Sequence, residues 1–347
     1  MAIAVPANAK TLGPHQDIMK TLVITGASGF IGLNIVEHFL RQGWRVRALA
    51  LDRIDPIALA DFARLPGELE TFIGDARDPE RIEALMGSGP IDAVVAGAAI
   101  TSGPKREGHA PSQIFEVNLV ATLRLLESAQ SRAVPRMVVF SSAAAMGELA
   151  FEGKVVTESD RPRPVSLYGT TKAALETLAT RWPVVAGTPR VLVVRLAAAL
   201  GPWERDTGLR DTLSVPLALV QCALSGEPIA PLPVAGARDY AYGPEVAAQI
   251  HWLLTAEAPA PQHNLYQLSS GFVWHPSIVA QALAQHGEPL TFKAGAREIA
   301  FHDDLTRRRS PMSADRISSE FRKPPPAQAC ADHYVRWALA HREWFAS

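Results

Sequence analysis

Short apolar runs alternate along the chain, up to residue 200, with longer stretches whose apolar residues recur at helical spacing. The runs predict strands at residues 21–25, 45–51, 69–73, 91–96, 136–141 and 191–196. The stretches between them predict helices at residues 30–42, 79–86 and 113–131, and a further helix that begins near residue 166. Strands that are joined through helices of this length pair in parallel by right-handed crossovers. The predicted fold class is therefore α/β, with a Rossmann-type doubly wound parallel sheet.

The pattern changes after Gly201, where prolines become frequent and strand signals become sparse. Helices are predicted at residues 213–225, 244–254, 277–285 and 329–343. Residues 1–19 have neither the basic start nor the apolar middle of a secretory signal, and we expect them to form a flexible leader. We expect a Rossmann domain at residues 20–200 and a smaller, mostly helical part at residues 201–347, with a ligand cleft between the two.

Composition and charge narrow the class of partner. The 347 residues suffice for a full hydrophobic core, and the formal net charge of -1 gives no indication of nucleic acid or an anionic membrane as a partner. There is no run of about 18 apolar residues that would span a membrane, so we expect a cytoplasmic protein. The histidines are scattered, and Cys222 and Cys330 stand in no ligand spacing, so neither a metal site nor a disulfide framework is predicted.

A glycine-rich turn follows the first predicted strand. Gly26 permits a tight turn, Gly29 lets the backbone approach a pyrophosphate, and Gly32 allows close packing of helix on sheet. The helix that begins here presents free amides and a partial positive charge to phosphates. The predicted cofactor-binding set of this turn is Gly26, Ser28, Gly29, Phe30, Ile31 and Gly32.

A tyrosine and a lysine stand four residues apart on the helix that begins near residue 166. This spacing places the side chains of Tyr168 and Lys172 on one helix face. A phenol titrates near pH ~10, and a neighbouring ammonium would favour the phenolate. Tyr168 could then take a proton from a substrate hydroxyl. An ordinary pair on the helix surface is the alternative.

These motifs resemble those of the extended short-chain dehydrogenase/reductases, also called the NAD-dependent epimerase/dehydratase family. The resemblance runs from about residue 20 to residue 345 and includes the T-G-x-x-G-x-x-G turn at residues 25–32. It implies that Asp75, with Ala76 beside it, lies near the adenine ring, and that Ala98 belongs to the small residues that line the cofactor. It implies a supporting role beside the cofactor for Asn118, and a role for Lys172 in holding the nicotinamide ribose.

The resemblance also implies a serine or threonine that contacts the reacting oxygen and the catalytic tyrosine. Counting back from Gly147 favours Ser142, with Ser141 as the alternative. The predicted catalytic set is therefore Ser142, Tyr168 and Lys172. Met146 stands where the family often has a tyrosine, which alters a wall of the site and not the acid/base groups.

The residues at the end of the second strand bear on the choice between NAD and NADP. By register with the glycine turn, the position that is usually acidic in NAD-binding proteins is Ala50. Asp52 lies two residues later and favours NAD, whereas Arg53 could meet a 2'-phosphate, and Leu51 replaces an arginine that NADP-preferring relatives often have. The cofactor is therefore NAD or NADP, with Asp52 as the argument for NAD.

The substrate side departs from the family pattern in one respect. Nucleotide-sugar members carry an asparagine where Ala198 stands, and a methyl group cannot donate a hydrogen bond to a diphosphate. Arg238 matches an arginine that contacts the diphosphate in relatives, although it would suit a carboxylate as well. Ser102 and Trp203, from two loops that usually face the substrate, complete the predicted substrate-binding set with Ser142, Ala198 and Arg238.

Three hypotheses follow. The first is a dehydrogenase or reductase that acts on a small polyhydroxylated compound such as a sugar, a sugar acid or a lactone. The second is a nucleotide-sugar epimerase that resembles the UDP-sugar 4-epimerases. The third is a non-catalytic dinucleotide-binding sensor. The resemblance also implies a homodimer, formed through the helices at residues 113–131 and 166–181.

Overall fold

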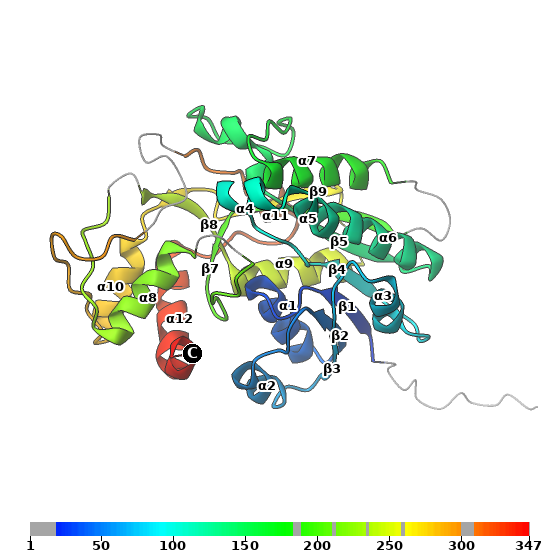
Figure 1. Cartoon of the computed structure of the whole chain (residues 1–347), viewed down its shortest axis with the longest axis horizontal. Helices are drawn as coiled ribbons and strands as arrows, with labels where there is room; N and C mark the ends of the chain where they lie inside the picture. Colours follow the sequence, from blue (N-terminus) through cyan, green and yellow to red (C-terminus); the bar gives the residue numbers. More distant parts are fainter. Residues whose placement is uncertain are drawn as a thin grey trace, which may run out of the picture.

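A seven-stranded parallel sheet forms the centre of the computed structural model, which describes residues 19–182, 189–209, 213–233, 236–257, 261–299 and 309–346 (Figure 1). Residues 1–18 of the expected leader lie outside the described residues. The strand order is β3-β2-β1-β4-β5-β6-β9, with all neighbours parallel. The strands are β1 (Thr21–Thr25), β2 (Arg45–Ala50), β3 (Glu68–Ile73), β4 (Ala93–Ala96), β5 (Arg136–Ser142), β6 (Arg190–Leu196) and β9 (Leu265–Leu268). The predicted doubly wound α/β fold is confirmed.

Helices cover both faces of the sheet, and each face has its own apolar core. Leu22 and Ile24 of β1 belong to the core that contains α1 (Phe30–Arg41), α2 (Pro56–Phe62) and α9 (Gly243–Thr255). Val23, between them, belongs to the core that contains α3 (Pro79–Met86), α6 (Ala121–Ser131) and α7 (Leu167–Thr180). Because successive strand residues point to opposite faces, burial on both faces explains why the central strand β1 is a continuous, almost wholly apolar run.

The chain returns to the main sheet after residue 200, so the expected division at that point is not a clean boundary. Strand β9 pairs with β6, and α9 packs on α1. A third core lies in the separate group of helices at the left of Figure 1, formed by α8 (Val215–Ser225), α10 (Ser277–Gln285) and α12 (Ala327–Ala340). A small sheet accompanies it, with the order β10-β8-β7. These short strands are β7 (Ala198–Leu200), β8 (Arg238–Tyr242) and β10 (Val273–Trp274).

The long helix predicted at residues 113–131 is interrupted. The structure has α5 (Pro111–Phe115), a π-helical segment (Glu116–Val120) and then α6. Asn118 lies in the middle of the π segment, which is a geometry that often marks a functional site. The remaining short helices, which the periodicity did not predict, are α4 (Pro104–His109) and α11 (Asp315–Glu320).

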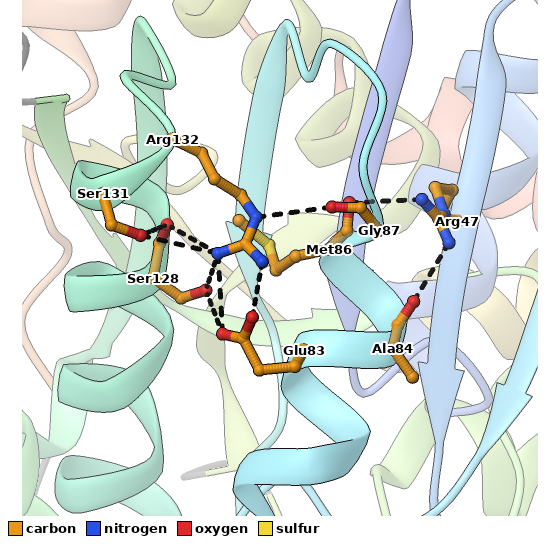
Figure 2. A network of polar contacts seen from close by, with 8 residues as sticks. All are labelled: Arg47, Glu83, Ala84, Met86, Gly87, Ser128, Ser131 and Arg132. Atoms are coloured by element: carbon orange, nitrogen blue, oxygen red, sulfur yellow. Dashed lines mark hydrogen bonds and ion pairs between the residues drawn. The ribbon is translucent and has the colours of Figure 1, made fainter.

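Two arginines hold the C-terminal end of α3 against its neighbours (Figure 2). Arg47 of β2 donates to the carbonyl oxygens of Ala84 and Met86 at 3.0 and 3.1 Å. Arg132, just after α6, pairs with Glu83 of α3. Cations are favourable at this end of a helix because its carbonyl groups carry partial negative charge. The network therefore holds α3 against β2 and against the end of α6.

Within the described part of the chain, no helix has both the length and the apolar character that crossing a bilayer requires.

Candidate active site

A cavity of about 1090 Å³ opens at the carboxyl ends of the parallel strands. Its lining runs from the glycine turn after β1, past the ends of β4 and β5, to Arg238 on β8. The neighbours β1 and β4 mark the point at which the strand order reverses, and ligands bind there in sheets of this type. Cavities of roughly 300–1,000 Å³ hold one ligand of ordinary size. The volume here suits a dinucleotide and a second, small molecule.

The glycine turn has the shape of a phosphate cradle. Gly26 has a φ of +71°, and a Cβ atom there would lie 2.6 Å from the backbone of Gly97. A Cβ atom on Gly32 would lie 2.2 Å from the Gly26 carbonyl oxygen. Helix α1 can therefore pack this closely on the turn only because residue 32 is glycine. All six residues predicted for this turn line the cavity: Gly26, Ser28, Gly29, Phe30, Ile31 and Gly32. The turn therefore fits the pyrophosphate of a dinucleotide.

The ends of β2 and β3 form the adjoining rim of the cavity. Leu51 and Asp52 line it, whereas Arg53 does not. Asp75 and Ala76 line it as well, and Arg77 donates to both carboxylate oxygens of Asp75. These hydrogen bonds lower the pKa of Asp75, so its carboxylate stays ionised. Ala98, after β4, lines the same space.

The three predicted catalytic residues come together in this cavity. Ser142 ends β5, Tyr168 and Lys172 lie on α7, and all three line the cavity. The Lys172 Nζ lies 5.7 Å from the centroid of the Tyr168 ring and donates to the Phe140 carbonyl oxygen at 2.9 Å. Burial lowers the pKa of Lys172 to about 8. An ammonium has three donors, so two remain for a ligand and for the phenol.

The structure distinguishes Ser142 from Ser141. The Ser142 Oγ accepts from the backbone amide of Ala144 at 3.1 Å, and its own hydroxyl hydrogen has no acceptor among the described residues. The Ser141 hydroxyl donates to Glu176 and is buried. Glu176 in turn forms a two-pronged ion pair with Arg195 at 2.8 Å for each contact. Ser142 is therefore the serine that can donate to a bound substrate.

The predicted substrate side also faces the cavity. Ser102, Ala198 and Arg238 all line it. Arg238 is mostly buried, and its Nη1 donates to the carbonyl oxygen of Ala237 at 2.7 Å. The methyl group of Ala198 offers no hydrogen-bond donor at the point where it meets the cavity.

A model of the NAD dependent epimerase/dehydratase family matches residues 22–268. The chain belongs to this family. It is 27% identical over 210 residues to the bifunctional UDP-glucose 4-epimerase and UDP-xylose 4-epimerase 3 of Arabidopsis thaliana, a match that covers 58% of each chain. It is 29% identical over 227 residues to the dTDP-6-deoxy-L-talose 4-dehydrogenase (NAD(P)(+)) of Kitasatospora kifunensis, covering 65% of this chain and 67% of the relative.

Among solved structures, the UDP-glucose 4-epimerase of Thermus thermophilus in complex with NAD has a TM-score of 0.70 at 25% identity. That match covers 93% of this chain and 100% of the other. The sequence matches are shorter than the structural one. This chain spans little more than half the length of the Arabidopsis relative.

One residue of the predicted substrate-binding set, Trp203, lies outside the cavity of this epimerase/dehydratase family member. Trp203 is fully buried and does not line the cavity. Its ring meets those of Phe62, Trp337 and Trp344 edge-on, and its Nε1 donates to Glu37 at 2.7 Å. The prediction that Trp203 binds substrate is wrong, because the indole fills the space between α1, α2 and the C-terminal helices.

Asn118 also acts behind the cavity and not in it. Its carboxamide is fully buried, accepts from the Ile100 amide at 2.8 Å and donates to the Ile100 carbonyl at 3.0 Å. It donates to the Thr171 hydroxyl on α7 as well, at 3.3 Å. Asn118 therefore joins the loop after β4 to the catalytic helix. Asn118 does not line the cavity, so it drops out of the predicted cofactor-binding set, and this geometry allows only the supporting role that the resemblance implies.

Glu107 was missed by the sequence analysis. Its Oε1 accepts from the backbone amide of Tyr168 at 2.9 Å and from the Ser102 hydroxyl at 3.3 Å, and it lines the cavity. The carboxylate thus caps the first turn of α7, where it is favoured by the helix dipole. No local signal could have shown this, because the two partners are 61 residues apart in the chain.

Proposed function

We propose that this family member is an NAD(P)-dependent oxidoreductase that acts on a hydroxyl-bearing carbon of a small polyhydroxylated substrate, such as a sugar, a sugar acid or a lactone. The convergence of Ser142, Tyr168 and Lys172 at the mouth of the nucleotide cradle carries the proposal. It gives one place in which a proton can leave the substrate hydroxyl and a hydride can leave the carbon that bears this hydroxyl. The sensor hypothesis loses its support, because nothing in sensing requires this set.

Each of the three side chains has a separate task. The Ser142 hydroxyl donates to the substrate oxygen and fixes its position. The Tyr168 phenolate takes the proton from that oxygen during oxidation, and the phenol returns it during reduction. The Lys172 ammonium stabilises the phenolate, and its anchor on the Phe140 carbonyl keeps α7 in place over β5. When bound, the nicotinamide supplies the hydride acceptor or donor.

The rim of the cavity favours NAD over NADP. Asp52 lines the cavity just after the end of β2, where the adenosine ribose hydroxyls lie in this fold. A carboxylate accepts hydrogen bonds from two hydroxyls and repels a 2'-phosphate. Arg53, the alternative partner for that phosphate, lies outside the cavity lining.

A nucleotide-sugar epimerase is the second candidate, and two observations favour it. Arg238 lines the cavity and could pair with a diphosphate, and 4-epimerases are among the relatives. Ala198 argues for the smaller substrate, because it contributes no donor to a diphosphate. The dehydrogenase therefore remains the leading proposal.

The variant Tyr168→Phe tests the proposed chemistry. We expect turnover to fall by at least 100-fold with sugar or sugar-acid substrates, since general acid–base catalysis contributes about 10²–10⁴-fold. Binding of NAD, measured by calorimetry, should stay within a few-fold of the wild type. Normal turnover by the variant would overturn the catalytic assignment.

The nucleotide released by denaturing freshly purified protein separates the two candidates. Mass spectrometry should find substoichiometric nucleotide if the cofactor exchanges at every turnover, as in a dehydrogenase. Stoichiometric NAD, together with calorimetric binding of UDP, would instead favour an epimerase that regenerates its cofactor on site.

A further inference from the structure

Residues 202–205, which follow β7, contact helix α1 and the start of helix α2. The Asn34 side chain on α1 donates to the Pro202 carbonyl oxygen at 2.8 Å, and Trp203 donates to Glu37 one turn further along α1. Arg205 then reaches Asp55, the residue that caps the N-terminus of α2. This segment from beyond residue 200 thus lies beside the ends of β1 and β2, where the adenosine half of a dinucleotide binds in this fold.

Arg205 lines the cavity and keeps donors from which no described residue accepts. Its Nη1 donates to the Asp55 carboxylate at 2.7 Å, and its guanidinium lies 4.9 Å from the centre of the Trp344 ring. Its Nε is buried. No group in the described chain accepts from Nη2, although the residue lines the cavity together with Leu51 and Asp52. The ion pair and the aromatic ring hold the guanidinium in one orientation, with Nη2 left for a ligand.

The end of β2 provides no cation of its own. Leu51 stands at the position from which an arginine could reach a phosphate, and Arg53 does not line the cavity. We propose that Arg205 supplies this missing cation and binds a phosphate group on the adenosine half of the dinucleotide. The phosphate is either the pyrophosphate or, in NADP, the 2'-phosphate. The two sources share the same chemistry, a hydrogen bond from a fixed guanidinium to a phosphate oxygen.

The inference rests on the proposed use of a dinucleotide and is independent of the substrate. It is therefore tested by affinity alone, with NAD, NADP and adenosine as probes in calorimetry on the full chain. Arg205→Met keeps the aliphatic packing on Trp344 and removes the guanidinium. We expect its dissociation constant for at least one dinucleotide to rise about 10- to 100-fold, as the loss of one charge-assisted hydrogen bond predicts.

Two control variants separate binding from structure. Asp55→Asn breaks the same ion pair but keeps the guanidinium and the cap of α2, because asparagine caps helices as well as aspartate. Arg41→Met removes an exposed arginine that pairs with Glu37 on the outside of α1. Arg41→Met should bind dinucleotide within about 3-fold of the wild type. Asp55→Asn should lose less affinity than Arg205→Met, because the guanidinium is still present although its anchor is gone.

The pattern across probes identifies the phosphate. An equal loss for NAD and NADP with unchanged adenosine binding assigns Arg205 to the pyrophosphate, and a loss confined to NADP assigns it to the 2'-phosphate. Unchanged affinity for both dinucleotides, or an equal loss in Asp55→Asn, would overturn the inference. Failure of the proposed function would appear separately, as normal turnover by Tyr168→Phe.

Discussion

Lys172 is buried at the base of the active site, with 3% of its surface exposed. Burial disfavours the ammonium and lowers its pKa from 10.5 to about 8. Between these two values the unfolded chain holds more protons than the folded one, so the free energy of unfolding rises with pH. Below pH 8 the lysine is charged in both states, and the full cost of burying the ammonium is present.

The variant Lys172→Met isolates this effect. Between pH 7 and pH 9.5 we expect the wild type to gain about 2 kcal/mol of unfolding free energy relative to the variant, since each pKa unit corresponds to about 1.4 kcal/mol. Urea titrations of both proteins at the two pH values measure the difference. If the two proteins change in parallel, Lys172 is not buried as an ammonium in the folded chain.

Residue identity alone did not locate every functional side chain. Tyr168 and Lys172 were predictable because helical spacing by itself puts them on one face. The burial of Trp203 was not, since the composition of a loop does not tell whether an indole faces a cavity or a core. The role of Glu107 was equally hidden, because its main partner is the backbone amide of Tyr168.

Helix α7 is held on the sheet by a buried ion pair. Glu176, one turn beyond Lys172, pairs with Arg195 of β6, and their side chains are only 5% and 2% exposed. Ser141 donates to the same carboxylate. The pair therefore sets the rotation of α7, and with it the position of Tyr168 and Lys172 over the cavity.

Breaking this pair should be costly. In Glu176→Gln the Arg195 charge remains buried without its counter-charge, and we expect a loss of about 3–5 kcal/mol. The matched control is Glu68→Gln, which breaks the exposed pair between Arg45 and Glu68 and should cost under about 1 kcal/mol. Chemical denaturation of the two variants measures both values. A comparable loss in both would contradict a structural role for the buried pair.

Most helices and strands were predictable where burial leaves a pattern of apolar residues in the sequence. The β1 run is apolar because both faces of the sheet are covered, and α10 begins and ends at the predicted residues, 277 and 285. Strand β9 escaped prediction because it has four residues and includes Gln267, whose register places it beside Arg195. The π segment escaped as well, since one additional residue in a turn leaves the apolar spacing nearly unchanged.

The three apolar cores together explain why a division of the chain at residue 200 was too simple. The first and second cores flank the parallel sheet, and the first includes α9 from beyond that residue. Only the third core, around α8, α10 and α12, belongs to the later part, apart from Leu200. The cavity lies where these parts meet, with walls from β1 to β8.

A homodimer remains a prediction from the family resemblance. The expected interface, at residues 113–131 and 166–181, falls on α5, the π-helical segment, α6 and α7. Ala173, Ala174 and Leu178 on α7 are only half-buried in the single chain. We expect sedimentation at micromolar concentration to give twice the mass of one chain. A monomer under those conditions would refute the prediction.

The central claim is that the Tyr168 phenol is the acid/base of the site, and its titration tests this most directly. The chain has five tyrosines, and burial raises the pKa of Tyr242, Tyr266 and Tyr334. Subtracting the ultraviolet titration of Tyr168→Phe from that of the wild type, both as NAD complexes, removes the other tyrosines and should leave one phenolate that forms below pH ~10. If no such phenolate forms, or if it persists in Tyr168→Phe, the assignment of Tyr168 as the acid/base is contradicted.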